Sequence, residues 1–176
     1  MKKLTTVLAV IIAVTAATVT AQDKAAPAAP AKATATFVGA DKCKICHKAQ
    51  FEAWSTTKHA KAWDALKPEE QKKAECVTCH QTGVTAEKVQ LNGVMCEACH
   101  GAGSEYKKPT IMNKAKFTAN KAAQLKIAEE AGLVIPTEAT CMKCHKKEGN
   151  PNFKEFDFAK MKLLVHPVKA AVPEKK

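Results

Sequence analysis

The chain has 176 residues, of which eight are cysteine and only 5% are aromatic. Its formal net charge is +11, but all 28 basic residues are lysine, whereas bidentate recognition of phosphate favours arginine. The composition therefore argues against a nucleic-acid-binding protein, and it supplies too few aromatic side chains for an ordinary aromatic-rich core.

The first 21 residues have the pattern of a secretory signal peptide. Lys2 and Lys3 precede an apolar run over 4–14, and Val19-Thr20-Ala21 forms a small-residue cleavage site before Gln22. A retained membrane anchor is the alternative, but the apolar run is short and rich in threonine for that role. We therefore expect an exported, periplasmic protein whose mature chain has no transmembrane segment.

Composition also predicts the domain boundaries of the mature chain. Residues 22–36 are mostly alanine, proline, lysine and threonine, which is typical of a disordered linker. A single domain is expected over 37–170, followed by a flexible tail over 171–176.

Four Cys-x-x-Cys-His motifs use all eight cysteines of the chain. Two thiols three positions apart can add to the two vinyl groups of one porphyrin, and the histidine that follows can bind its iron from the proximal side. Zinc ribbons also use paired Cys-x-x-Cys units, but zinc does not require a histidine at this fixed place. Thioredoxin-like redox chemistry requires a βαβ pattern that the sequence lacks. The sequence therefore predicts four covalently attached haem c groups, held by Cys43, Cys46 and His47, by Cys76, Cys79 and His80, by Cys96, Cys99 and His100, and by Cys141, Cys144 and His145.

Between the motifs the pattern predicts a mainly α fold, in which short helices and long loops surround four haems with minimal β structure. Residues 48–54 are expected to be helical, and a second helix is expected from Ser55 to Leu66, where Pro68 would end it. The stretch 81–95 contains the turn signal Asn92-Gly93 and predicts a loop with a small hairpin. Because this connection is short, the second and third haems are expected to be neighbours.

The second half of the chain predicts one longer helix and the cover of the last haem. Residues 118–131 form the clearest helical pattern, with Thr118 as the cap and Gly132 at the end. Pro136-Thr137-Glu138 is expected to begin the turn that carries the fourth motif. Three phenylalanines are expected to cover the last haem: Phe153, Phe156 and Phe158.

The number of histidines limits how the four irons can be ligated. Four irons have eight axial positions, but the chain has 6 histidines, four of which are proximal ligands. His59, on a predicted apolar helix face, and His166 remain as distal ligands, so at most two haems can be bis-histidine. Met112 is a candidate thioether ligand, and Met161 a weaker one. A remaining open position would bind small ligands such as nitric oxide and permit catalysis.

The haems also change how the charge is interpreted. Loss of Lys2 and Lys3 lowers the formal charge from +11 to +9, and four haems would add about eight negative propionate charges. The lysines are therefore expected to be solvated, to pair with propionates or to meet an acidic redox partner.

Three stretches resemble the cytochrome c-554 family of multihaem cytochromes: Trp54-Ser55-Thr56-Thr57-Lys58-His59-Ala60, Cys76-Val77-Thr78-Cys79-His80-Gln81-Thr82-Gly83, and Gly93 through Tyr106. With the late His166, the resemblance covers nearly all of 40–168. It implies a mainly α-helical fold with closely stacked haems, periplasmic electron transfer and one five-coordinate haem for which nitric oxide reduction has been proposed. It also implies His59 as a distal ligand. Members often carry a further histidine soon after the third motif, where this sequence has Tyr106.

Three functional hypotheses follow. The leading one is a periplasmic carrier that passes electrons between redox protein partners, rather than an enzyme. The second is a reductase of a small nitrogen oxide at an open haem. The third is a homo-oligomeric filament in which His59 or His166 binds a haem of the next subunit. In each case the haem of Cys96–His100 is the first candidate for an open or unusually ligated iron.

Overall fold

The computed structural model describes residues 35–166. The predicted signal peptide, most of the predicted linker and the tail after 170 lie outside the described residues. No helix in the described part is long and apolar enough to cross a membrane.

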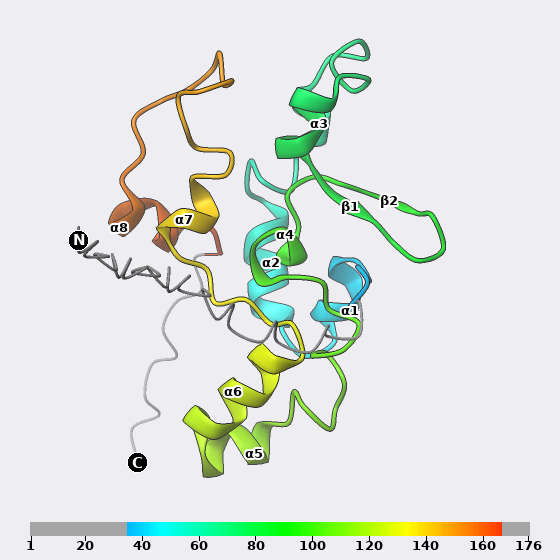
Figure 1. Cartoon of the computed structure of the whole chain (residues 1–176), viewed down its shortest axis with the longest axis vertical. Helices are drawn as coiled ribbons and strands as arrows, with labels where there is room; N and C mark the ends of the chain where they lie inside the picture. The colour runs from blue at the N-terminus through cyan, green and yellow to red at the C-terminus, as the bar shows by residue number, and fades with distance from the viewer. Residues whose placement is uncertain (1–34, 167–176) are drawn as a thin grey trace, which may run out of the picture. The chain divides into compact units, whose positions relative to one another are not determined.

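Figure 1 shows short helices joined by long connections, which confirms the mainly α fold. The elements are α1 (Ala40–Lys44), α2 (Lys48–Ser55), the 3₁₀ turn η1 (Trp63–Ala65), α3 (Ala74–His80), β1 (Gln81–Val84), β2 (Gln90–Asn92), α4 (Cys96–His100), α5 (Lys114–Ala119), α6 (Lys121–Glu130), α7 (Glu138–Cys141), α8 (Phe158–Met161) and the 3₁₀ turn η2 (Lys162–Leu164).

Each Cys-x-x-Cys-His motif lies on or next to a short helix. The second motif ends α3, the third motif is the whole of α4, and the first and fourth motifs continue from α1 and α7. A helical turn places residues i and i+3 on one side, so both thiols of a motif can face the same neighbour. The predicted turn before the fourth motif is confirmed, because the Thr137 side chain and Thr140 form a reciprocal cap at the start of α7.

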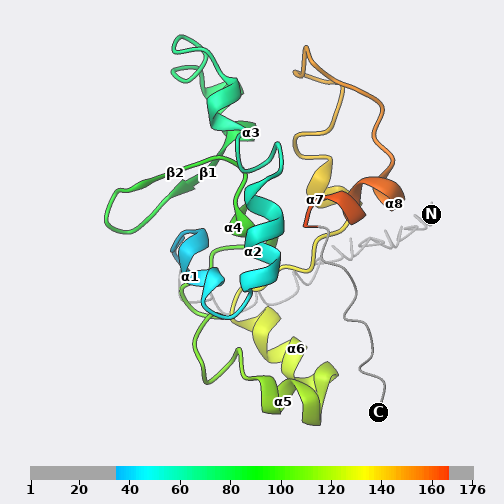
Figure 2. The ribbon, with the colours of Figure 1, turned by 180° about the vertical axis from the view of Figure 1, so that it is seen from behind.

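The small hairpin predicted for 81–95 is confirmed, but its turn lies elsewhere. β1 and β2 are antiparallel, with Gly83 opposite Leu91. The chain reverses between Thr85 and Val89, where the Thr85 amide donates to the Val89 carbonyl at 2.9 Å. Asn92 instead ends β2. In Figures 1 and 2 the hairpin extends away from the helices that carry the motifs.

The predicted helix from Ser55 to Leu66 is wrong. α2 continues through Ser55, and the next residues form turns before η1. The His59 carbonyl accepts a hydrogen bond from the amide of Val94 at 2.9 Å, and the Thr57 hydroxyl donates to the Trp54 carbonyl at 2.7 Å. These bonds replace the regular i to i+4 pattern that a helix requires.

The predicted helix over 118–131 is two helices. Asn120 separates α5 from α6 and caps α6, because its side-chain oxygen accepts from the Ala123 amide at 3.0 Å. Thr118 lies inside α5, where its hydroxyl donates to the Lys114 carbonyl at 2.9 Å. The predicted end is confirmed, since Gly132 follows α6 with a φ of 101°. Asparagine ends one helix and starts the next because its amide competes with the backbone for hydrogen bonds.

The protein core of the described part is small. Its buried apolar side chains are Ala40, Leu91, Tyr106 and Ala128, and its buried polar ones are Glu97 and Gln124. Large apolar side chains such as Ile45, Leu163 and Leu164 are exposed. So few buried side chains would stabilise a chain of this length poorly on their own.

Candidate functional site

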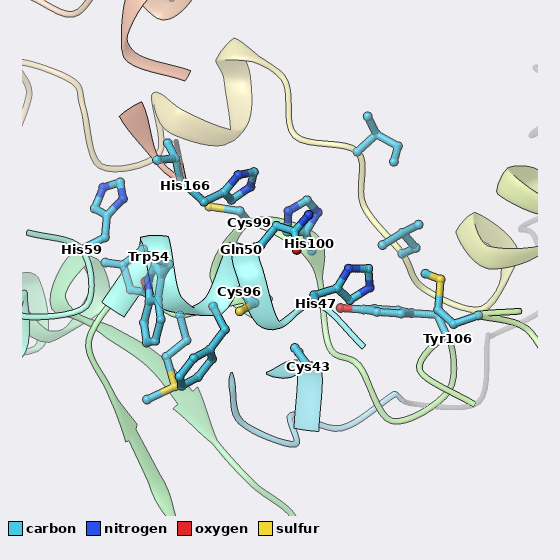
Figure 3. A pocket seen from close by; sticks show the side chains of 17 residues that line it. Cys43, His47, Gln50, Trp54, His59, Cys96, Cys99, His100, Tyr106 and His166 are labelled. Carbon is cyan, nitrogen blue, oxygen red and sulfur yellow. The ribbon is translucent and has the colours of Figure 1, made fainter. Parts of the chain in front are cut away.

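A cavity of about 310 Å³ is lined by side chains of the first and third motifs. The thiols of Cys43, Cys96 and Cys99 and the imidazoles of His47 and His100 line it, as Figure 3 shows. The other walls are mostly apolar and include Phe51, Trp54, Val94, Leu133 and Ile135. Thiols and imidazoles thus face an apolar space, which is the arrangement that a flat apolar ligand with a metal centre needs.

Contacts between thiols pair the motifs across the chain. The thiol of Cys43 in the first motif interacts with that of Cys96 in the third, and this interaction raises the pKa of Cys43 and lowers that of Cys96. In the same way the thiol of Cys144 in the fourth motif interacts with that of Cys79 in the second, and burial together with this interaction raises the pKa of Cys144 to about 12. The second and third motifs, whose haems were expected to be neighbours, are joined by the backbone, because the Gly93 amide donates to the His80 carbonyl at 2.9 Å.

The third motif also lies near the fourth. Cys99 interacts electrostatically with Cys141, although burial is the main reason that the pKa of Cys99 is raised. Interactions between cysteines thus link the first motif with the third, the third with the fourth and the fourth with the second. All eight cysteines are free of disulfide bonds.

His59 lies against the histidine of the fourth motif. The ring centroids of His59 and His145 are 6.0 Å apart with an interplanar angle of 62°. Burial, followed by the neighbouring His145, lowers the pKa of His59, and burial also lowers the pKa of His145. Both rings therefore favour the neutral form, which is the form that binds a metal ion. Phe156 stacks on the other flank of His145 at 4.6 Å.

His166 lies near the histidine of the third motif. Both rings line the cavity, and Figure 3 shows them side by side. Burial is the main reason that the pKa of His100 is lowered, and the charge of His166 lowers it further. The structure thus brings each predicted distal histidine next to a different proximal one.

Two proximal histidines are oriented by backbone carbonyls. The Nδ1 atom of His100 lies 3.2 Å from the Val134 carbonyl oxygen, and the Nδ1 atom of His80 lies 2.5 Å from that of Ala62. An imidazole that donates from Nδ1 presents the lone pair of Nε2, so these contacts select the tautomer that can bind a metal through Nε2.

Glu97, inside the third motif, ties three segments together. Only 2% of its surface is exposed. Its carboxylate accepts hydrogen bonds from the amides of Val38, Gly39 and Gly103, at 2.6 to 3.1 Å. A buried carboxylate needs such donors, and here they connect the chain before the first motif with the chain after the third.

Similarity to known proteins agrees with this arrangement. A family model described as "Cytochrome c554 and c-prime" matches residues 42–101. Cytochrome c-554 of Nitrosomonas europaea is 33% identical over 145 residues, which are 68% of this chain and 62% of that protein. The chain belongs to the cytochrome c-554 family. A structure of the reduced state of cytochrome c554 from Nitrosomonas europaea matches with a TM-score of 0.50 and 28% identity, over 75% of this chain and 84% of that chain. The chain thus spans less than two thirds of the curated relative's length.

Membership of the cytochrome c-554 family confirms the predicted family and fold and implies covalently bound haem c. The residues present fit that group. Thiols and imidazoles that follow the Cys-x-x-Cys-His spacing share an apolar cavity. The donor set therefore suits a porphyrin iron better than zinc.

Tyr106, which follows the third motif, is held in place by a hydrogen bond and by burial. Its hydroxyl donates to the Gly101 carbonyl at 3.0 Å, and 7% of its surface is exposed. Burial, with Cys43 and Glu97 nearby, raises its pKa. The phenol therefore stays neutral beside the cavity, which it lines together with Met112.

Sequence reasoning missed the role of Glu97. A charged residue between the two cysteines of a motif is expected to be solvent-exposed. In the first and fourth motifs the residues at such positions, Lys44 and Lys143, are indeed exposed. The two glycines that follow, Gly101 and Gly103, were the available signal. A Cβ at Gly103 would lie 2.9 Å from a carboxylate oxygen of Glu97, so only glycine allows this approach.

Proposed function

We propose that this chain is an exported tetrahaem c-type cytochrome that carries electrons between redox protein partners in the periplasm. The observation that carries the proposal is the set of four Cys-x-x-Cys-His motifs, brought by the fold into a connected series in which thiols of successive motifs contact or interact. The proposed boundaries are a signal peptide over 1–21, a linker over 22–36, the haem domain over 37–170 and a tail over 171–176.

The chain's own residues would attach and orient the cofactors. Each cysteine S–H would add across one vinyl group, so that a C–S bond forms and the proton ends on the neighbouring vinyl carbon. The proximal histidines His47, His80, His100 and His145 would each present a nitrogen to one iron. A haem c bound in this way supplies a one-electron Fe(III)/Fe(II) couple.

Two irons would have a second histidine. The separation of 6.0 Å between the rings of His59 and His145 supports His59 as the distal ligand in the fourth motif. The place of His166 beside His100 in the cavity supports it as the distal ligand in the third. The third haem, which we expected from the sequence to be open or unusually ligated, would then be bis-histidine. Because both distal histidines lie against proximal histidines of their own chain, no second subunit is needed to supply them, which weighs against the filament hypothesis.

The contacts between motifs support a single route through the protein. In the order first, third, fourth and second, each motif has a cysteine in contact or electrostatic interaction with the next. Electrons would therefore be received and delivered at the first and second motifs, which are the two ends of the series.

The surface at the first motif supports an acidic redox partner. Lys42, Lys44 and Lys48 surround this motif and are exposed, and between them Ile45 is 80% exposed. An apolar residue within a basic surface can dock against an acidic protein, since opposite charges accelerate association and a small apolar contact lets the complex dissociate quickly.

Reduction of a small nitrogen oxide is the second candidate function. The chain has 6 histidines, and the pairing above leaves both His47 and His80 without a second one. An iron with an open position at the second motif could bind such a ligand. Electron transfer remains the first proposal because it needs only the series of motifs.

The electron-carrier proposal is tested by reduction kinetics of the exported holoprotein. A carrier is expected to exchange electrons rapidly with an acidic periplasmic redox protein and to show no turnover with nitrite or hydroxylamine. Sustained turnover of either compound, with slow exchange between proteins, would favour the reductase instead.

A further inference from the structure

The histidine assignments leave the first motif in an unusual position. The ring of His59 lies 6.0 Å from that of His145, His166 lies beside His100 in the cavity (Figure 3), and the chain has 6 histidines in total. His47 therefore has no histidine available as its counterpart. The second axial ligand of that iron would therefore come from another type of side chain in the cavity that His47 lines.

Met112 supplies a thioether to the cavity that His47 lines. It lines the same cavity as Cys43 and His47, and its side chain is only half-buried, so its sulfur is not packed away inside the protein. Thioether sulfur is a soft donor, and methionine with histidine is a well-suited axial pair for haem iron.

The backbone at Met112 is held from two sides. Its amide donates to the Lys108 carbonyl at 2.8 Å, which closes a helical turn. The buried side chain of Gln124, on α6, donates to the Ile111 carbonyl at 2.6 Å. These two bonds fix the backbone that carries the Met112 side chain, and a metal ligand requires such a set position.

Tyr106 is a poorer ligand, although it lines the same cavity. A tyrosine binds haem iron through its oxygen, but this hydroxyl is already committed to the Gly101 carbonyl at 3.0 Å. Ligation would break that bond and leave a partly buried carbonyl without its donor.

The remaining thioethers of the described part are placed less well. Met95 lines the same cavity, but it immediately precedes Cys96, and its amide donates to the Thr82 hydroxyl at 2.7 Å, which holds it to the third motif. Met142 lies between the two cysteines of the fourth motif, and Met161 is 41% exposed on α8.

We propose that the thioether of Met112 is the distal ligand of the iron that His47 binds. The proposal rests on the tetrahaem function proposed above and deepens it. It makes the first motif the only His/Met site, and methionine ligation raises the reduction potential relative to bis-histidine ligation. The iron at the exposed end of the series would thus be more readily reduced than the irons of the third and fourth motifs.

Spectroscopy of the ferric holoprotein and of its variants tests the proposal. The wild type is expected to show the near-infrared charge-transfer band of an iron–thioether bond and one high-spin haem, that of His80. Met112→Ala should abolish the band, add a second high-spin haem in electron paramagnetic resonance and allow carbon monoxide to bind one more haem after reduction. Met112→His should keep that haem low-spin but lose the band and lower its potential.

Two further methionine variants are controls. Met161→Leu should leave every signal unchanged, and Met95→Leu should keep the band. Absence of the band from the wild type, its survival in Met112→Ala or its loss in Met95→Leu would overturn the proposal. The haem content of each variant, measured as the pyridine haemochrome, separates this failure from that of the tetrahaem function: fewer than four haems per wild-type chain would contradict the proposed function itself, whatever the band shows.

Discussion

The imidazoles of His59 and His145 lie 6.0 Å apart, centroid to centroid, although two complete Cys-x-x-Cys-His motifs separate them in sequence. An iron bound to two imidazole nitrogens at about 2.0 Å on each side separates the ring centroids by about 6 Å. The fold therefore holds the two rings at the separation that one shared iron requires.

Replacement of His59 tests this relationship. His59→Ala should turn one low-spin bis-histidine haem into a high-spin haem, so that about a quarter of the haem absorbance changes spin state. The measurement is electron paramagnetic resonance of the ferric holoprotein, with the exposed neighbour variant Lys58→Ala as control. Unchanged low-spin signals in His59→Ala would show that His59 binds no iron.

Glu97→Gln should destabilise the protein. The carboxylate accepts from three backbone amides, and an amide in its place loses the charge and turns an NH₂ group toward at least one donor. Loss of a buried, charged hydrogen-bond acceptor costs about 2–3 kcal/mol, which should appear in chemical denaturation followed by circular dichroism. The exposed Glu69→Gln variant should stay within about 0.5 kcal/mol of wild type. Equal stability of the two variants would mean that Glu97 does not join the segments as described.

Two glycines with similar φ values provide a matched test of backbone approach. Gly101 has a φ of 78°, and a Cβ there would lie 2.5 Å from the Gly132 carbonyl oxygen. Gly149 has a φ of 73°, and no neighbouring atom lies within 4 Å of where its Cβ would be. Gly149→Ala should cost about 1–2 kcal/mol for its conformation alone.

Gly101→Ala should cost clearly more, because the chain before α7 must also move. The difference between the two free energies of unfolding is the quantity to measure. If the two costs are the same, residue 101 is not in close contact with the 132 carbonyl.

Electron exchange should depend on the lysines around the first motif. The triple variant of Lys42, Lys44 and Lys48 to glutamine should slow reduction by an acidic flavodoxin about tenfold at low salt and flatten the dependence of the rate on ionic strength. The control replaces three exposed lysines of α5 and α6, which are Lys114, Lys121 and Lys126. Equal slowing by both triples would indicate an effect of net charge rather than of this surface.

Much of the fold and site followed from local patterns in the sequence. The helical character of each motif, the hairpin after His80 and the capped turn at Thr137 depend on neighbouring residues, so spacing and turn chemistry predict them. The family was also predictable, because blocks such as Cys96–Ser104 are compact and specific.

Other features depend on distant parts of the chain. The stretch after Ser55 has a helical pattern, but the His59 carbonyl bonds to Val94, and this tertiary contact outweighs the local preference. The break at Asn120 is a local signal that the helical composition around it obscured. The thiol pairing of the first motif with the third could not be read from spacing, because sequence proximity favoured the second with the third.

Counting the electrons that one chain accepts tests the central proposal most directly. In a reductive titration of the purified, exported holoprotein, four electrons per polypeptide should be taken up reversibly and returned to a protein acceptor. Uptake of fewer than four electrons per chain, or reduction that no protein acceptor can reverse, would contradict the account of a tetrahaem electron carrier.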